Sequence, residues 1–292
     1  MKGKSLIILA SFLVLASCDK VEKPLDEGAT IVCDPAVLVP RKVLIEDLTG
    51  HLCNNCPGAA KVAEDIVEFY DKNAIVVGVH VTSNFAAPIL SNWASFGYPD
   101  SSFMTDFRTD PGDALLAAYT PTGLPAGLIS RKPFNNSTVL GENTWFSAAS
   151  DIICKEAAAL VVIDNVNYNS GSREVSADIS VQSRADLAGV HRLTVYVTED
   201  HVIDWQLDAD QNPAYVSDYE HRHVLRDKID GGGNNTALGE IIFSNSSSGD
   251  IDVTSVTGNL STEWNASNCY LVAFVSSPDG EVLQAEEFKI LP

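Results

Sequence analysis

The chain has few basic residues and no long hydrophobic run beyond its first residues. Nineteen Lys and Arg stand against 39 Asp and Glu in 292 residues, so the formal net charge is −20. Such a chain repels phosphate backbones and anionic head groups, and we expect no nucleic-acid partner. No later apolar stretch approaches the length of a transmembrane helix, and no internal repeat is present.

The one long apolar stretch lies at the N-terminus. "SLIILASFLVL" follows Lys2 and Lys4, a pattern typical of a secretory signal peptide, here residues 1–17. It ends in "LASC", which resembles the bacterial lipobox and predicts lipidation of Cys18. The alternative is an ordinary cleaved signal followed by a chance cysteine. The sequence therefore predicts a cell-envelope protein that is anchored to a membrane, without spanning it, through lipid on Cys18.

A length of 292 residues exceeds what one hydrophobic core usually serves, so we expect two domains. Residues 18–39 mix charge with Pro and Gly and read as a tether. Residues 40–156 and 157–292 differ in pattern and read as the two domains.

The first predicted domain, residues 40–156, alternates strands and helices. "KVLIEDL" is a buried strand, "PGAAKVAEDIVEFYDK" is an amphipathic helix, and "AIVVGVHV" is a second buried strand. This order predicts a parallel pair with a right-handed crossover. An aromatic and helical insertion follows at about 84–118, then a hairpin and a last helix, "ENTWFSAASDIICKEAAAL". We expect an α/β domain with a mixed sheet flanked by helices.

The second predicted domain, residues 157–292, consists of short β-rich stretches separated by turn signals such as "NSGS" and "SPDG". The stretches are "VVIDNVNY", "REVSADISVQ", "RLTVYVTE", "GEIIFS", "DIDVTSV", "CYLVAFVS" and "EVLQAEEFKI". Seven such strands without a notable helix predict an all-β immunoglobulin-like sandwich.

The cysteine count is informative because disulfides persist in the cell envelope. Setting aside Cys18, five cysteines remain: Cys33, Cys53, Cys56, Cys154 and Cys269. An odd number leaves at least one thiol free or paired with another chain. If Cys53 and Cys56 pair locally, two of the other three can form a bridge, and the sequence does not say which two.

Cys53 and Cys56 form a CxxC motif between a buried strand and the start of a helix. The free N–H groups and positive end of that helix stabilise a thiolate, so the first cysteine becomes a nucleophile and the second resolves the mixed disulfide. Asp47 precedes the motif on the strand, where a desolvated carboxyl would exchange a proton with the resolving thiol. The alternative is a carboxylate facing solvent at the strand end.

This arrangement resembles the thioredoxin superfamily over about residues 40–156. "TGLPAGL" places Pro125 before an apolar strand, similar to the family's cis-proline segment. The resemblance implies that Pro125 is cis, shapes a substrate groove and discourages metal capture by the thiols. A turn proline without that role is the alternative. Leu52 and the pair Asn54-Asn55 depart from the residues usual around the motif in redox-active members, which puts the redox poise in doubt.

A resemblance over nearly the whole mature chain is to the 28-kDa outer membrane protein family of Bacteroidetes, a group of lipoproteins. It is carried by "VLIEDLTGHLCNNCPGAA", by "YEHRHVLRD" and by the closing "NCYLVAFV" and "GEVLQAEEFKI". This resemblance implies an outer-membrane lipoprotein with a thioredoxin-like domain followed by a β-sandwich. It leaves the biochemical activity undefined.

Metal sites are the competing interpretation of these residues. Cys53 and Cys56 with His51 would supply three zinc ligands, but no second CxxC supplies a fourth. His221 and His223, with Glu220, form a weak candidate site in which both imidazoles lie on one side of an extended strand. The favoured alternative is that both histidines form hydrogen bonds, while Arg222 and Arg226 pair with aspartates. No cofactor is expected.

Two functional hypotheses follow. The first is a thiol–disulfide oxidoreductase or folding factor of the envelope, in which Cys53 attacks, Cys56 resolves, Asp47 moves a proton and Pro125 orients the substrate. Its partners would be thiols or disulfides of envelope proteins. The second is a surface binding or adhesion lipoprotein in which Cys53–Cys56 is a static disulfide. The aromatic segment from Trp93 to Phe107 would either cover the motif or pack on the sheet.

Overall fold

The computed structural model describes residues 33–34, 36–229 and 239–291. The predicted signal peptide, Cys18 and most of the predicted tether lie outside these residues, so they stay predictions. Among the described residues, no helix has both the length and the apolar character needed to cross a bilayer.

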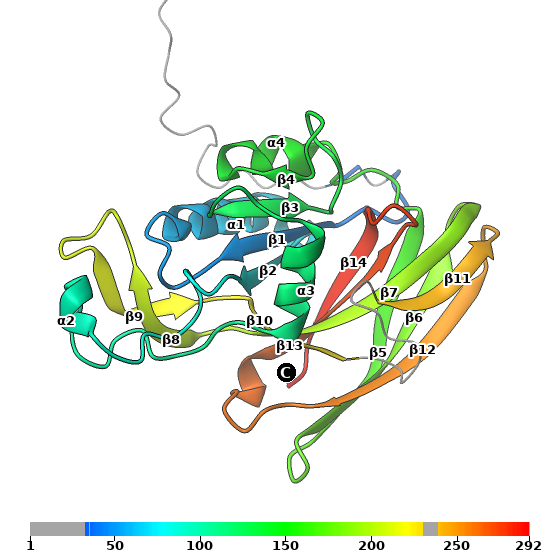
Figure 1. The fold of residues 1–292 in the computed structure, drawn as a ribbon. Coiled ribbons are helices and arrows are strands. Elements are labelled where there is room, and N and C mark those ends of the chain that lie inside the picture. Colours follow the sequence, from blue (N-terminus) through cyan, green and yellow to red (C-terminus); the bar gives the residue numbers. More distant parts are fainter. Residues whose placement is uncertain (1–32, 35, 230–238, 292) are drawn as a thin grey trace, which may run out of the picture.

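Four α-helices and fourteen strands make up the described chain (Figure 1). The helices are α1 (Cys56–Tyr70), α2 (Trp93–Phe96), α3 (Asp110–Ala118) and α4 (Trp145–Ser150). The first seven strands are β1 (Val43–Thr49), β2 (Ala74–His80), β3 (Ala126–Ile129), β4 (Val139–Leu140), β5 (Ala159–Asn169), β6 (Glu174–Ser183) and β7 (Leu187–Glu199). The others are β8 (Val202–Leu207), β9 (Tyr215–His221), β10 (Val224–Ile229), β11 (Glu240–Ser246), β12 (Ile251–Asn259), β13 (Cys269–Ser276) and β14 (Val282–Lys289).

One large sheet runs through most of the molecule. Its strand order is β14-β13-β7-β10-β2-β1-β3-β4, and β11 also pairs with β7. β1 and β2 are parallel, as the strand–helix–strand pattern predicts, and β3 pairs antiparallel to β1. The two halves join where β10 pairs with β2, through Val224 opposite Gly78. A side chain at Gly78 would meet the carbonyl oxygen of Arg222 at 3.2 Å, so glycine permits this close approach.

The prediction of a helix-flanked thioredoxin-like domain followed by a separate immunoglobulin-like sandwich is wrong. The fold is mostly β, and a single nine-stranded sheet contains strands from both predicted domains. One hydrophobic cluster joins Leu44 and Val77 to Tyr196, Val272 and Phe274, so the two halves also share a core. Local periodicity predicted strands but could not reveal that β10 pairs with β2.

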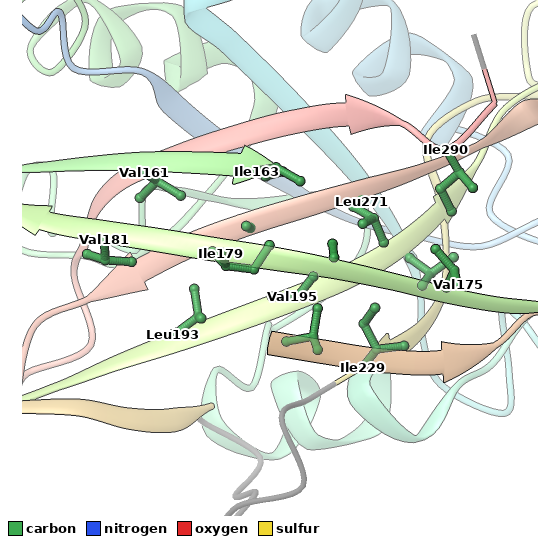
Figure 2. Packing of buried hydrophobic residues seen from close by; sticks show 14 of the residues in the cluster. Val161, Ile163, Val175, Ile179, Val181, Leu193, Val195, Ile229, Leu271 and Ile290 are labelled. Atoms are coloured by element: carbon green, nitrogen blue, oxygen red, sulfur yellow. The ribbon is translucent and has the colours of Figure 1, made fainter. Parts of the chain in front are cut away.

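The second layer is a three-stranded sheet, β12-β6-β5, at the other end of the molecule from α2 (Figure 1). Alternate residues of β5 and β6 are buried, which is the period-two pattern of a strand with one solvated face. Figure 2 shows these side chains facing those of β7, β10 and β13, with Val161, Ile179, Val195 and Leu271 in the common core. Apolar burial between the two sheets holds this half together.

Both faces of β1 are buried. Val43 and Ile45 pack toward α1 and α4, whereas Leu44 and Leu48 pack in the cluster that includes β13 and β14. A fully buried ion pair lies on the second face, because Arg131 donates to both carboxylate oxygens of Glu46 at 2.7 and 2.6 Å. The guanidinium also lies 5.0 Å from the centre of the Phe274 ring. This pair therefore ties β1 to the strands contributed by the C-terminal half.

The question of cysteine pairing is answered by the structure. Cys33 is bonded to Cys154 across a sequence separation of 121 residues, and Cys53 is bonded to Cys56. Cys269 is the free cysteine of the described chain, and it is buried. Cys154 has a positive φ of 61° after α4, which ends at Ser150 and is much shorter than the helix the sequence predicts.

Candidate functional site

The Cys53–Cys56 disulfide lies at the start of α1. The two Cα atoms are 5.4 Å apart, and the Cys56 amide donates to the Cys53 carbonyl at 3.2 Å. Pro57 occupies the first turn of α1, where its missing N–H costs little. Ala59, Ala63, Ile66 and Tyr70 form the buried stripe that holds the helix on the sheet. The predicted strand–CxxC–helix arrangement is therefore present.

The disulfide is covered by β8, which the sequence analysis missed. Gln206 Nε2 donates to the carbonyl oxygen of Cys53 at 2.9 Å, and the Leu207 amide donates to that of His51 at 2.8 Å. Cys53 and Cys56 are only 2% and 1% exposed. The chain segment after β7 is thus hydrogen-bonded to the CxxC loop, and both cysteines are buried.

Asp47 is buried beside the motif. It lies on β1 opposite Gly78 and is 3% exposed, so the alternative of a solvent-facing carboxylate is not what the structure contains. Burial, with a smaller contribution from the charge of Glu142, raises the pKa of Asp47 to about 8. Its Oδ1 atom has no hydrogen-bond partner. Asp47 is therefore a mostly protonated, neutral carboxyl at pH 7, and it can donate this proton to a neighbouring group.

Pro125 follows a cis peptide bond, as the resemblance implied. It directly precedes β3, whose first residue, Ala126, pairs with Leu48 at the end of β1 that leads into the motif. Its role in orienting a substrate stays a prediction.

Three histidines surround Phe107 beneath β8 and β9. His80 stacks on the Phe107 ring at 4.6 Å, His221 lies 4.9 Å from it, and His51 meets it edge-on at 5.3 Å, all between ring centres. Desolvation lowers the pKa of all three imidazoles, to about 4 for His221. The cluster is therefore uncharged at neutral pH and joins the CxxC loop, β2 and β9.

Acidification is expected to destabilise the fold through His221. The unfolded imidazole binds a proton near pH 6.5 and the folded one only near pH 4, so stability is lost as the pH falls through this window. Stability that depends on Asp47 changes with pH in the opposite direction. The contribution of His221 is therefore isolated by comparing the unfolding free energies of the wild type and His221→Gln in urea. The difference in unfolding free energy should change by about 2 kcal/mol between pH 7 and pH 5. An unchanged difference would mean that His221 is not held neutral.

The weak metal candidates lie in different surroundings. His221 belongs to the histidine cluster, whereas His223 contacts Glu64 at 3.1 Å and Asp200 at 3.3 Å. Burial lowers the pKa of His223, but the hydrogen bond to Glu64 and the charge of Asp200 outweigh this and raise it. Glu220 contacts His201 and Arg222. In the part of the chain that the structure describes, no three His, Cys, Asp or Glu side chains are arranged to hold a metal.

The arginines of this segment pair with glutamates rather than with aspartates as expected. Arg222 lies 3.0 Å from Glu220, and Arg226 donates to Glu199 at 2.7 Å.

The aromatic segment packs against the β8–β9 hairpin. Phe103 is fully buried and lies 5.7 Å from the Trp205 ring, and Thr105 donates to Asp204. The Leu52 amide donates to the carbonyl oxygen of Phe85, just before the segment. Figure 1 places α2 beside this hairpin at one end of the molecule. The segment thus supports the hairpin that covers the disulfide.

A cavity of about 450 Å³ adjoins the disulfide. It lies at the carboxyl ends of the parallel strands β1 and β2, the position where ligands bind in many open sheets that contain parallel strands. Asp47, Thr49, His80 and Cys56 line it on one side, and the segment Tyr219–His223 lines it on the other. Cys53 does not line it. The sequence signalled Cys56 and Asp47, but nothing local in the sequence marked His80 or Gln206.

The fold and site define a β-rich protein with a buried CxxC disulfide and, beside it, a cavity whose lining includes several titratable side chains. The family model of the outer membrane protein Omp28 matches residues 112–291, and the chain belongs to this family. The expected membership is confirmed, although the matched region begins after the CxxC motif. Membership places the protein in the outer membrane of the cell envelope.

Solved structures with a similar fold are also known. The fold is similar to that of HBP35 of Porphyromonas gingivalis, with a TM-score of 0.62, 16% identity, and coverage of 86% of this chain and 76% of that one. The archaellum stator protein FlaG from Sulfolobus acidocaldarius matches at a TM-score of 0.23 and 15% identity, over 44% of this chain and 99% of its own. A TM-score this low does not indicate a shared fold. No curated protein matches the chain.

Proposed function

We propose that this outer-membrane family member exchanges thiols and disulfides through the Cys53–Cys56 couple. The observation that carries the proposal is Asp47, a buried carboxyl whose pKa is raised to about 8 and which lines the same cavity as Cys56. Strongly shifted carboxyls of this kind gather at sites that move protons.

Reduction of the Cys53–Cys56 disulfide requires a proton donor, and Asp47 can serve as one. Reducing the disulfide produces thiolates that must be protonated, and a carboxyl that is neutral at pH 7 can give its proton to Cys56. A static disulfide needs no proton donor. An ionisable group kept out of water at this position costs stability, so its presence favours a chemical role over a structural one.

A second candidate is a binding protein in which the disulfide only fixes the start of α1. The low exposure of Cys53 and Cys56, and the hydrogen bond from Gln206 over Cys53, favour it. In this case the cavity rather than the disulfide would be the functional feature.

We also propose that lipid on Cys18 anchors the protein to the membrane. The proposal rests on the lipobox-like "LASC" at the end of the apolar N-terminal stretch. Mass spectrometry of the mature N-terminus should find a lipidated cysteine as its first residue. A mature protein that keeps an unmodified Cys18 would contradict this anchor.

The reduction potential of the folded protein separates the two candidates. Under the redox proposal the Cys53–Cys56 couple titrates above about −300 mV, and single-cysteine variants of the pair accumulate mixed disulfides in the envelope. A Cys269→Ser variant should leave both results unchanged, because that thiol is buried elsewhere. A potential below about −300 mV with no mixed disulfides would favour the static interpretation.

A further inference from the structure

The cavity is lined by one cysteine of the pair and not by the other. Cys56 lines the cavity together with Gln206, whereas Cys53 does not line it and its carbonyl oxygen accepts a hydrogen bond from Gln206 on β8. An incoming sulfur that enters through the cavity therefore meets Cys56 first. The sequence assigns the opposite roles, with Cys53 as the reactive residue, because it considers the helix N-terminus without the strand that covers it.

The size of the cavity selects small partners. A volume of about 450 Å³ is in the range of small-molecule sites and excludes a folded protein. Asp47, which lines the cavity, also has a buried atom without a partner, since its Oδ1 forms no hydrogen bond. Unsatisfied atoms of this kind are rare in native proteins and suit a ligand that supplies the missing partners.

The rim of the cavity carries both charges. Glu64 and Glu220 are acidic groups that line it, and Lys61, Arg222 and His223 are basic groups that line it, with His223 in contact with Glu64. Lys61 pairs with Asp65 and Arg222 with Glu220, but these side chains are partly exposed, with 75% of Lys61 and 49% of Arg222 accessible. Exposed pairs contribute little, so exchanging them for ligand contacts costs little. A rim of this kind fits a molecule that carries an ammonium and a carboxylate close to its sulfur.

We propose that the cavity binds a low-molecular-weight amino-acid thiol or its disulfide, which reacts at Cys56. This inference rests on the thiol–disulfide function proposed above. It makes the co-substrate a small zwitterionic thiol, and it inverts the roles of Cys53 and Cys56 predicted from the sequence.

The exchange balances in two steps. A small thiolate attacks Cys56 Sγ, a mixed disulfide forms, the Cys53–Cys56 bond breaks, and Cys53 leaves as a thiolate. A second small thiolate attacks the small-molecule sulfur of the mixed disulfide, which releases the small disulfide and the Cys56 thiolate. Asp47 protonates Cys56 and regains its proton from solvent. Two thiols are oxidised, one protein disulfide is reduced, and the two thiol protons end on Cys53 and Cys56. The reverse sequence reduces the small disulfide.

The test uses the full-length folded protein with cystine as the probe and peptide mass spectrometry as the readout. Cys53→Ser should acquire a cysteine adduct at Cys56 at least about tenfold faster than Cys56→Ser acquires one at Cys53, because only Cys56 adjoins the cavity. Cystine should react faster than cystamine, which lacks the carboxylates, and faster than dithiodipropionate, which lacks the amines.

A cavity-filling variant provides the matched comparison. Ala60→Phe narrows the cavity from α1 and keeps both cysteine positions unchanged, and Ala118→Phe places the same side chain on an exposed part of α3. In the Cys53→Ser background, the first should slow adduct formation about tenfold and the second should not change it. Ala60→Leu replaces Ala60→Phe if the larger residue prevents folding.

Different outcomes would contradict the small-thiol route through Cys56 and the thiol–disulfide exchange function. Faster reaction at Cys53 than at Cys56, equal rates for the three probes, or no effect of Ala60→Phe would overturn the small-thiol route and leave thiol–disulfide exchange intact. If neither single-cysteine variant reacts until the protein is unfolded, both the route and the exchange function fail.

Discussion

Replacing Asp47 with asparagine is expected to stabilise the protein and to slow its thiol–disulfide exchange. The folded carboxyl keeps its proton up to about pH 8, whereas the unfolded one loses it near pH 3.8. Between these values the unfolded state gains by ionising, so stability is lost as the pH rises. Asparagine cannot ionise, and Asp47→Asn should raise the unfolding free energy by up to about 4 kcal/mol at pH 7.

The pH dependence identifies the cause. The gain from Asp47→Asn should shrink to about 2 kcal/mol at pH 5, because the unfolded carboxyl is then less strongly favoured as an anion. Urea unfolding at both pH values measures it. In parallel, the rate at which cysteine reduces the Cys53–Cys56 disulfide should fall at pH 7, because asparagine has no carboxyl proton to donate to Cys56.

Glu142→Gln is the control for Asp47→Asn, since it removes the minor charge contribution while leaving the carboxyl in place. Glu142→Gln should change the unfolding free energy and the thiol–disulfide exchange rate only slightly. If Asp47→Asn destabilised the fold, the Asp47 carboxyl would not be neutral in the folded protein at pH 7. If the variant were stabilised with an unchanged exchange rate, Asp47 would have no part in proton transfer.

Breaking the buried pair between Arg131 and Glu46 is expected to cost more than any surface change. Side chains of these residues are 3% and 0% exposed, so Arg131→Met leaves the Glu46 carboxylate without a partner in an apolar cluster. Removing one member of such a pair typically costs about 3–5 kcal/mol of unfolding free energy. Urea unfolding at pH 7 measures the loss.

A double variant separates the cost of an orphaned charge from the value of the pair. Glu46→Leu with Arg131→Met removes both charges, and its loss should be smaller than that of Arg131→Met alone. Lys61→Ala breaks the exposed pair with Asp65 and should cost less than about 1 kcal/mol. A double variant as unstable as the sum of the two single ones would show that Glu46 and Arg131 do not interact.

The local features of this protein were predictable from its sequence, and the long-range ones were not. All seven β-rich stretches after residue 160 form strands, because alternation of buried and exposed residues is a local property. The strands β8, β9 and β10 were missed: "VIDWQL" and "YEHRHVLRD" mix charged and apolar residues without a clear period. The pairing of β10 with β2, which makes one sheet out of two predicted domains, depends on residues about 145 positions apart.

The same division applies to the site. Cys53, Cys56 and Asp47 lie within ten residues of each other, so one short stretch signalled them. Gln206 covers the motif from more than 150 residues away, and an isolated glutamine in "DWQLD" carries no local signal. His80 is another case, because its neighbours in the cluster come from the CxxC loop and from β9.

The order of the cysteines along the chain has a consequence for biosynthesis. The Cys33–Cys154 bridge joins the first and last of four paired cysteines, with Cys53 and Cys56 between them. Synthesis runs from the N-terminus, so Cys33 is made beside two wrong partners long before Cys154 exists. Early closure of the three-residue Cys53–Cys56 link removes both competitors. The shortest bridge thereby protects the longest one from mispairing, whichever use the mature protein makes of it.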